Sequence, residues 1–448
     1  MSGQNERLEI VVVGGGMITQ DQILPSLYHL QRQGVIGSIR ICALNSAPLR
    51  VLAEFSRFAE AFPGQGFEAF PSLDSPPERM HPDLFKEVIA GLPPGNLVVV
   101  AVPDHLHAGV IRVALEHGQH VLTVKPLVPT YAEAVEIHKL AQAKGLFVGV
   151  EYHKRFDRRA LDARGLYRAG RFGQFRCGEA KMIEPYYYRH SNFQNWFTKD
   201  HSDPFTYVGC HYVDLVHFIT GLRPVEVSVR GVEGTFPNGN VGYMWAQGQV
   251  VWENGALLSI TDGLGYPDEA AGTNDQGLVM YCESDDCAAI LKHDDQYRGV
   301  QHGYIDRLAG TKFRFVSPDY FRLVPWDGEG LRPVGYGFES IEALVLAAQR
   351  VNAVGATGTP NAKRSRLGTR PCGCPPSGQA QGPAPTGDQT LAARQRVLAE
   401  IDERGVLATP GDSWINELVT EAARLSIAQN GQSALIDYDP TPKVRLRP

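Results

Sequence analysis

Two side chains in separate parts of the sequence could exchange a proton with a bound molecule, and a glycine-rich turn could hold a phosphate. Lys125 ends a short apolar run and precedes Pro126, which disfavours helical geometry at the lysine. His211 follows Gly209 and Cys210 in a later apolar segment. An amine and an imidazole are groups that act as general acid or base near neutral pH. Whether the amine and the imidazole can act on one molecule depends on the strands and helices that position them.

The glycine turn has the context that a dinucleotide-binding fingerprint requires, because it follows a β-branched run and precedes a helical pattern. Gly14 permits a tight turn, and Gly16 lets the backbone approach a pyrophosphate. Met17 and Ile18 open the helix whose N-terminal amides meet the negative charge. Thr19 stands where glycine or alanine is usual, so we expect looser packing of strand and helix there. A glycine-rich turn of another doubly wound fold is the alternative.

The end of the second expected strand bears on the choice between NAD and NADP. An acid there would bind the ribose of NAD, whereas a basic group would suit the extra phosphate of NADP. The chain has Asn45 and Ser46 at this place, and Arg50 further on is expected to be a solvated helix residue. Asn45 can bind a ribose hydroxyl without repelling a phosphate. The sequence therefore leaves both cofactors open.

The first 150 residues alternate apolar β-branched runs with helical patterns, which predicts parallel strands joined by crossover helices. Thr130 and Glu133 form a capping box before one helix, and Gly145 ends it. Polar groups that follow the strands then lie at one edge of the sheet, where open α/β sheets bind ligands. The expected strands are residues 8–13, 39–44, 97–102, 120–124 and 147–150.

After about residue 155 the hydrophobic pattern changes to longer runs in which apolar and polar residues alternate, separated by turn signals. This pattern predicts a mostly antiparallel sheet. The fold class is thus α/β, with a dinucleotide-binding domain over residues 1–150 and a second α/β domain over 151–356. Residues 357–390 are rich in Gly, Pro, Ser and Arg and are expected to be a linker or insertion. Residues 391–448 should form helices and a strand that pack back on the body, followed by a basic tail over 443–448.

Composition and charge exclude several classes of protein. The 448 residues are 43% hydrophobic and 21% charged, as in an ordinary globular protein. The net charge of −6 offers no basic excess for nucleic acid, and the apolar runs are shorter than the roughly 18 residues of a membrane helix. Seven cysteines without Cys-x-x-Cys spacing, and His105 and His107 without acidic or cysteine partners, predict no metal site. The polar N-terminus favours a cytoplasmic location.

Several ordered motifs resemble the glucose–fructose oxidoreductase, inositol dehydrogenase and rhizopine-catabolism (Gfo/Idh/MocA) family. The run from Pro103 through His107 to Ala114, the segment 117–121 and Lys125-Pro126 carry the first part of the resemblance. Residues 209–214 are similar to the family's Gly-x-His-x-x-Asp motif. The resemblance spans residues 8–221 and is diffuse beyond them.

The resemblance implies a Rossmann domain, a second domain with a large open sheet, and NAD(P)-dependent hydride transfer at a secondary alcohol of a sugar, glycoside or cyclitol. It places Lys125 and His211 beside the nicotinamide, as catalytic residues, and Pro103, His107 and Pro126 near the cofactor. Two positions depart from the family pattern. Val124 stands where the family has a glutamate, and Tyr207 stands where many members have an aspartate. The phenol of Tyr207 could replace that acid.

Two segments supply substrate-binding candidates. His153 and Lys154 follow the last strand of the first domain, where the family reaches the substrate. The segment 184–196 combines aromatic rings, amides and an arginine, which suit a sugar, although an aromatic contact between domains or subunits is equally compatible. Asp214 could touch substrate, orient its loop or cap a helix. The candidates of the aromatic segment are Tyr188, Arg189, Asn195 and Trp196.

Two other functions remain open at this point. A relative that keeps its NAD bound could hydrolyse or eliminate a glycoside by transient oxidation, and a catalytically inactive relative could bind a ligand without turnover. In each case the expected partner is a carbohydrate or polyol, with a homodimer or homotetramer as the assembly.

Overall fold

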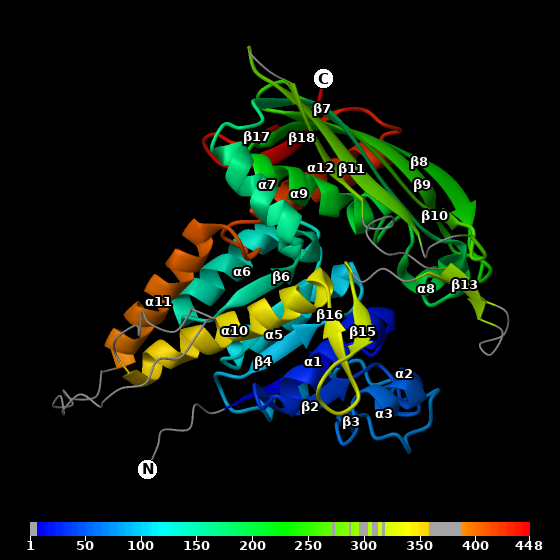
Figure 1. The fold of residues 1–448 in the computed structure, drawn as a ribbon, viewed down its shortest axis with the longest axis vertical. Coiled ribbons are helices and arrows are strands. Elements are labelled where there is room, and N and C mark those ends of the chain that lie inside the picture. The colour runs from blue at the N-terminus through cyan, green and yellow to red at the C-terminus, as the bar shows by residue number, and fades with distance from the viewer. Residues whose placement is uncertain are drawn as a thin grey trace.

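The computed structural model describes residues 7–270, 274–285, 288–294, 303–306, 312–315, 319–357 and 387–448. These residues form two lobes, each built on its own sheet (Figure 1). The expected linker over 357–390 lies mostly outside the described residues, and its last four residues begin a helix. Within the described residues, no helix is long and apolar enough to cross a membrane.

The N-terminal lobe contains a six-stranded parallel sheet in the order β3-β2-β1-β4-β5-β6. This order is that of a Rossmann fold, and it reverses between β1 and β4. The crevice outside the carboxyl ends of these two strands is therefore the expected cofactor site. The predicted parallel sheet is confirmed, and its strands are β1 (Leu8–Val13), β2 (Ile36–Cys42), β3 (Glu68–Phe70), β4 (Leu97–Val100), β5 (His120–Val124) and β6 (Val148–Glu151).

Helices cover both faces of this sheet because its strands are apolar on both sides. One face packs on α1 (Leu24–Arg32), α10 (Tyr336–Thr357) and α11 (Gly387–Arg404). The other face packs on α4 (Leu84–Ala90), α5 (His107–Glu116) and α6 (Tyr131–Lys144). The capping prediction for α6 is confirmed, because Thr130 accepts a hydrogen bond from the amide of Glu133 and Gly145 adopts a φ of 62°.

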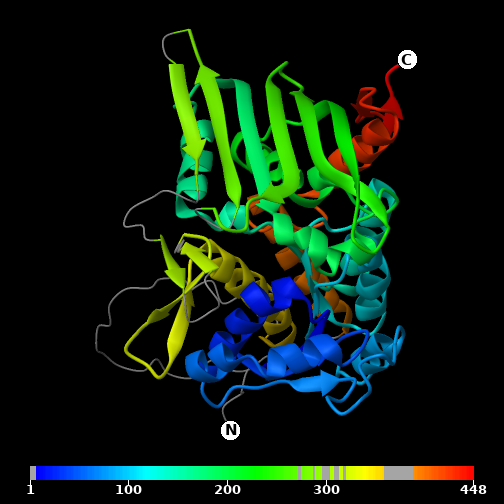
Figure 2. The same ribbon diagram turned by 90° about the vertical axis from the view of Figure 1, so that its right-hand side faces the viewer.

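The C-terminal lobe contains an eight-stranded sheet in the order β12-β11-β7-β10-β9-β8-β17-β18. Only the β7–β10 pair is parallel among these strands, so the sheet is mostly antiparallel as expected. Helices α7 (Arg158–Arg168), α9 (Cys210–Thr220) and α12 (Trp414–Ala428) pack on one face. Figure 2 looks onto the opposite face, which carries no helix of the described residues. The strands are β7 (Gln174–Pro185), β8 (Pro224–Thr235), β9 (Val241–Trp252), β10 (Leu257–Tyr266), β11 (Asp275–Glu283), β12 (Ala288–His293), β17 (Ala434–Asp437) and β18 (Lys443–Leu446).

The end of the chain differs from the expected basic tail. Lys443–Leu446 form β18, which pairs antiparallel with β17 and extends the large sheet. Alternating exposed basic and half-buried apolar residues explain the difference, because they give this segment the period of an edge strand. Two small hairpins, β13 (Gly303–Asp306) with β14 (Lys312–Phe315) and β15 (Arg322–Pro325) with β16 (Leu331–Val334), complete the described strands.

Candidate active site

Lys125 leaves the carboxyl end of β5 and reaches the C-terminal lobe. Its Nζ donates a hydrogen bond to the backbone carbonyl of Tyr207 and lies 3.8 Å from the centroid of the Tyr207 ring. An ammonium group over an aromatic face is attracted by the ring quadrupole, here in addition to the hydrogen bond. Lys125 is therefore fixed against the segment that leads into His211.

His107 positions the turn that carries Lys125. Its ring is completely buried, with Nε2 2.9 Å from the carbonyl oxygen of Val102 and Nδ1 2.8 Å from that of Pro126. The imidazole thus joins the end of β4 to the residue after Lys125. Both ring nitrogens are engaged by the backbone, so His107 acts by holding this edge in place. Pro103 begins the adjacent short helix Asp104–Leu106.

His211 lies at the start of α9, directly after the π-helical turn Phe205–Gly209. Its side chain is buried, and its Nδ1 has no hydrogen-bond partner among the described residues. Burial lowers the pKa of His211 well below the ordinary value, and the nearby positive charges of His153, Lys125 and Lys154 lower it further. The imidazole is therefore neutral and can accept a proton.

Tyr207 occupies an aromatic cluster. Its ring makes edge contacts with Phe193, Trp196 and Phe197, with centroids 5.2–5.8 Å apart. Burial raises the pKa of Tyr207 well above its ordinary value, so its phenol stays protonated. The residue supplies three different features to the site: an aromatic face and a carbonyl for Lys125, and a phenolic hydroxyl.

Two buried carboxyl groups from the C-terminal sheet approach the same region. Glu184, near the end of β7, has its pKa raised by burial and partly lowered again by Lys125. Asp262, in β10, has its pKa raised well above the ordinary value by burial. A Cβ at Gly209 would lie 2.5 Å from Asp262 Oδ2, so the turn before His211 packs directly on this acid. Neither acid was predicted as a site residue, because only strand pairing brings them to Lys125.

A buried network anchors His153, which was a substrate-binding candidate. The carboxylate of Glu151 accepts hydrogen bonds from Gln22 Nε2 at 2.8 Å and from Ser340 Oγ at 2.6 Å. Its other oxygen lies 3.0 Å from His153 Nδ1. The His153 ring lies 4.6 Å from that of His211, centroid to centroid.

Lys154 and two tyrosines complete this side of the site. Lys154 is almost fully buried and donates to Gln276 Oε1 at 2.7 Å. The rings of Tyr320 and Tyr336 lie 5.0 and 5.5 Å from the His153 ring. No sequence motif marks these tyrosines, because they follow β14 in a part of the chain where the family resemblance is diffuse.

The glycine turn fits a bound pyrophosphate. Gly14 has a φ of 116°, and a Cβ there would lie 2.0 Å from the carbonyl oxygen of Ala101. Gly16 has open space around it, with no atom within 4 Å of a Cβ position, and a helix begins at the next residue. The expected loose packing at Thr19 is wrong, because Thr19 is fully buried and its hydroxyl donates to the Gly14 carbonyl at 2.8 Å. The turn thus keeps an open backbone surface at a helix N-terminus.

The side chains that follow the glycine turn and β2 contact other parts of the protein. Met17 packs beside the aromatic cluster of the C-terminal lobe, and Ile18 packs on the sheet core. Asn45 is half-buried, and its Oδ1 accepts a hydrogen bond from the amide of Ala47, the first residue of the next helix, at 3.0 Å. Ser46 is buried and donates to the carbonyl of Ser75 at 2.6 Å.

Arg50 is held by the same loop that binds Ser46. Its Nε donates to the carbonyl oxygen of Leu73 at 2.7 Å, and its Nη2 donates to that of Ser75 at 3.0 Å. Arg50 therefore stabilises the loop after β3 rather than being only a solvated helix residue.

Asp214 forms a buried ion pair with Arg155. The guanidinium donates to both carboxylate oxygens, at 2.8 and 2.6 Å, and Asn416 Nδ2 donates at 2.8 Å. Arg155 also pairs with Asp412. These partners favour the orienting role of Asp214 over substrate contact, and they join α9 to the C-terminal segment.

The aromatic candidates are divided between the site and the surface. Tyr188 is buried, stacks on Phe193 at 4.7 Å and bonds to Glu184. Trp196 packs beside Tyr207. Arg189 lies over the ring of Tyr186 and donates to the backbone carbonyl of Leu264, and Asn195 is exposed and bonded to Asn192. Arg189 and Asn195 are therefore engaged by groups of their own lobe.

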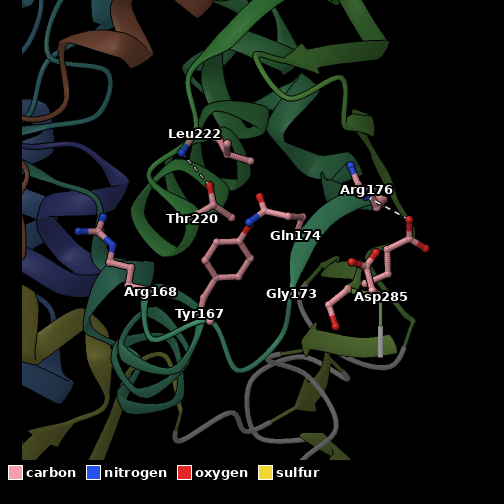
Figure 3. Close-up of a pocket in the computed structure, with 11 residues that line it drawn as sticks. Tyr167, Arg168, Gly173, Gln174, Arg176, Thr220, Leu222 and Asp285 are labelled. Atoms are coloured by element: carbon pink, nitrogen blue, oxygen red, sulfur yellow. Dashed lines mark hydrogen bonds and ion pairs between the residues drawn. The ribbon is translucent and has the colours of Figure 1, made fainter. Parts of the chain in front are cut away.

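A surface pocket of about 580 Å³ lies elsewhere in the C-terminal lobe (Figure 3). Its walls include Tyr167, Gln174, Thr220 and Asp285, from the ends of α7 and α9, the start of β7 and the turn after β11. None of the candidate residues described above lines it. Among the described residues, no cluster of His, Cys, Asp and Glu could hold a metal ion.

Comparison with family models assigns both lobes. Residues 8–152 match the model described as "Oxidoreductase family, NAD-binding Rossmann fold", and residues 160–284 match that of the "GFO/IDH/MocA C-terminal domain". The two matches cover more than half of the chain.

Curated relatives are similar over shorter segments. Inositol 2-dehydrogenase 1 of Saccharopolyspora erythraea is 31% identical over 137 residues, which are 30% of this chain and 38% of the relative. An uncharacterized oxidoreductase of Schizosaccharomyces pombe is 40% identical over 79 residues, which are 18% of this chain and 22% of the relative. The chain thus spans less than half the length of these relatives.

Solved structures share the fold over nearly the whole chain. The NAD complex of GenD2 from gentamicin A biosynthesis has a TM-score of 0.61 at 16% identity and covers 96% of this chain and 97% of that one. An inositol dehydrogenase homolog from Azotobacter vinelandii, complexed with NADH and myo-inositol, has a TM-score of 0.58 at 18% identity, covering 96% and 98%. At these identities the similarity establishes the fold alone.

Proposed function

Because this chain belongs to the Gfo/Idh/MocA oxidoreductase family, we propose that it oxidises a secondary alcohol of a sugar, glycoside or cyclitol, or catalyses the reverse reduction. Its N-terminal lobe is an NAD-binding Rossmann domain, and the protein is an NAD-binding oxidoreductase. The observation that carries the finer proposal is the hydrogen bond from Lys125 to the Tyr207 carbonyl, which brings the amine to the turn that leads into His211. Lys125 is also near enough to lower the pKa of His211, which supports a site shared by two proton-exchanging groups from different lobes.

The glycine turn is the proposed pyrophosphate site, with Gly14, Gly16 and the amides of Met17 and Ile18 around it. Asn45, which follows β2, is the residue proposed to bind a ribose hydroxyl. NAD is favoured over NADP, because Arg50 is already bonded to two backbone carbonyls. When bound, the nicotinamide accepts the hydrogen and the electron pair of the alcohol C–H bond.

The chain's own groups manage the hydroxyl proton. The Lys125 amine is held at the junction of the lobes and can hydrogen-bond the reacting oxygen. His211 is neutral because of its burial and the surrounding positive charges, so it can take up the proton as the carbonyl forms. Tyr207 holds Lys125 with its ring and carbonyl and has a protonated phenol available as a donor.

The surroundings of the site support a polyhydroxyl substrate. Glu184 and Lys154 are buried polar groups within interacting range of one another, and Tyr188 bonds to Glu184. Such groups can exchange hydrogen bonds with neighbouring hydroxyls of one ring. Because the Azotobacter vinelandii homolog is complexed with myo-inositol, cyclitols are the first probes.

The proposal is tested by mixing the protein with NAD or NADP and a panel of inositols, sugars and glycosides while NADH or NADPH absorbance is followed. We expect absorbance to grow in proportion to one class of added alcohol, with NAD preferred. A product formed without net cofactor reduction would indicate the cofactor-retaining hydrolase or lyase instead. Cofactor binding without turnover of any member of the panel would contradict the proposal.

For the assembly, we propose a homodimer formed through the helix-free face of the C-terminal sheet (Figure 2). This face would otherwise leave a broad sheet surface in water, and apolar side chains such as Val232, Tyr281 and Ile290 are more than half exposed. Light scattering tests the mass in solution. A monomer at micromolar concentration would contradict this assembly.

A further inference from the structure

Glu151 and His153 form a buried carboxylate–imidazole pair that the roles proposed above do not use. Oε1 of Glu151 already accepts from Gln22 and Ser340, and Oε2 lies 3.0 Å from His153 Nδ1. The oxygens of a carboxylate can only accept hydrogen bonds, so the nitrogen that bonds to Oε2 carries the hydrogen. His153 is therefore held as the Nδ1–H tautomer, with Nε2 left as the acceptor.

The other groups around His153 leave Nε2 available. His211 faces it from α9, Tyr320 precedes β15, and Tyr336 begins α10. Lys154 follows it in the chain and bonds Gln276. Among the described residues, Nε2 of His153 and the buried Nδ1 of His211 have no hydrogen-bond partner, and the two rings lie 4.6 Å apart, centroid to centroid. These are the two ring nitrogens left to exchange a proton between the imidazoles.

The two imidazoles differ in their ability to keep a proton. His211 is buried beside the positive groups of Lys125 and Lys154, which oppose a further positive charge. His153 has the carboxylate of Glu151 against its other nitrogen, and such a partner stabilises an imidazolium as in the Ser-His-Asp arrangement. A proton shared by the pair therefore rests on His153.

We propose that His153 is the proton acceptor of this active site, reached through His211, and that Glu151 is its positioning residue. The inference rests on the proposed function and adds to it the resting place of the proton. It also explains how the site could work with Tyr207 where many family members have an aspartate, because the carboxylate of Glu151 supports His153 as a base.

The transfer balances with the oxidation. The alcohol O–H bond breaks, its electron pair becomes the second bond of the carbonyl, and its proton goes to one nitrogen of His211. The other nitrogen of His211 passes a proton to Nε2 of His153. His211 ends neutral, and His153 ends as an imidazolium paired with Glu151. The hydride leaves to the oxidised cofactor that the proposed function already includes.

Nitrogen NMR of the NAD-bound protein, with ¹⁵N-labelled histidine, tests the pair without any substrate. The signals are assigned by their loss in His153→Asn and His211→Asn. We expect neutral His153 to be the Nδ1–H tautomer and to take up a proton before His211 as the pH falls. Glu151→Gln should switch His153 to the Nε2–H tautomer, because the new amide would present its NH₂ group to Nδ1. An Nε2–H tautomer in the unaltered protein, or protonation of His211 first, would overturn the inference.

Kinetics with myo-inositol as the probe give a second readout. His153→Asn and Glu151→Gln should each lower kcat about 10- to 100-fold, as expected for loss of a proton acceptor, with little change in the KM for NAD. The matched controls are His117→Asn, at the end of α5, and Glu136→Gln, in α6. Both residues are exposed, so these variants should leave kcat unchanged. Unchanged kcat in both His153→Asn and Glu151→Gln would refute the role of His153 as proton acceptor. Failure of the proposed function would look different, because the unaltered protein would then oxidise no alcohol.

Discussion

The ammonium group of Lys125 donates a hydrogen bond to the backbone carbonyl of Tyr207 and lies 3.8 Å from the centroid of its ring. This contact joins the turn after β5 to the segment before α9. It uses the backbone and the aromatic face of Tyr207, so an aspartate at this position is not needed to hold the lysine. At this position the ring and backbone carbonyl of Tyr207 therefore hold the lysine in place of the family's aspartate.

Substitutions at Tyr207 separate the roles of its ring and its phenol. Tyr207→Phe keeps the aromatic face and should lower alcohol oxidation less than about tenfold. Tyr207→Leu removes the cation–π contact, which is worth about 2 kcal/mol when desolvated, and should cost roughly 30-fold. Steady-state NADH formation measures both. An equal loss in Tyr207→Phe and Tyr207→Leu would assign the main role to the phenol, because both variants lack it.

Three alanine substitutions at glycines test the cofactor cradle. Gly16→Ala should leave the folding stability nearly unchanged, because nothing lies within 4 Å of the added Cβ, but should weaken NAD binding at least about tenfold. Gly14→Ala should destabilise the fold, because its Cβ would meet the Ala101 carbonyl at 2.0 Å. Gly109→Ala, on an exposed part of α5 with equal space, is the control. Calorimetric NAD titration and thermal melts provide the data, and unaltered NAD affinity in Gly16→Ala would exclude this turn as the cradle.

His120 should make the fold sensitive to acid. Its ring is buried between the Phe147 amide, which donates to Nδ1, and the Asn352 side chain, and burial lowers the pKa to about 4 from 6.5. The unfolded chain binds a proton below pH 6.5 that the folded chain does not, so stability falls as the pH drops from about 6.5 towards 4. The full difference is on the order of 3 kcal/mol. Urea unfolding of the protein and of His120→Gln should show a shallower pH dependence for the variant, and equal slopes would contradict this.

Glu417 should have the opposite dependence. This residue of α12 is completely buried, accepts a hydrogen bond from the Leu127 amide, and has its pKa raised from 4.5 to about 8 by burial. Between these two pH values the folded chain keeps a proton that the unfolded chain releases, so stability decreases as the pH rises towards 8. Glu417→Gln keeps the acceptor and removes the titration. Its stability relative to the unaltered protein should increase from pH 5 to pH 9, and a constant difference would show that Glu417 ionises normally.

Local patterns predicted the Rossmann lobe well because its signals are short-range. Strand β1 begins and ends where its β-branched run does, and the capping pair Thr130 and Glu133 sets the start of α6. The end of the chain was less well predicted, since β18 forms only by pairing with β17.

The candidate site was predictable only in part. Lys125 and His211 stand in motifs that a single sequence can display, whereas their proximity depends on the packing of two lobes. Glu184 and Asp262 reach the site because β7 and β10 pair in parallel, a register that no local pattern specifies. Ser46 and Arg50 were expected near a cofactor or solvent, but both bind the loop after β3, whose path the sequence does not indicate.

The most direct test compares NADH formation by the unaltered protein and by Lys125→Met over the panel of inositols and sugars, with NAD affinity measured in parallel. The removed ammonium is the group that would hydrogen-bond the reacting oxygen, whereas the pyrophosphate cradle is formed by other residues. We predict a loss of at least about 100-fold in turnover, in the range of general acid–base contributions, with NAD binding mostly retained. Turnover near that of the unaltered protein in Lys125→Met would contradict the proposed role of the lysine.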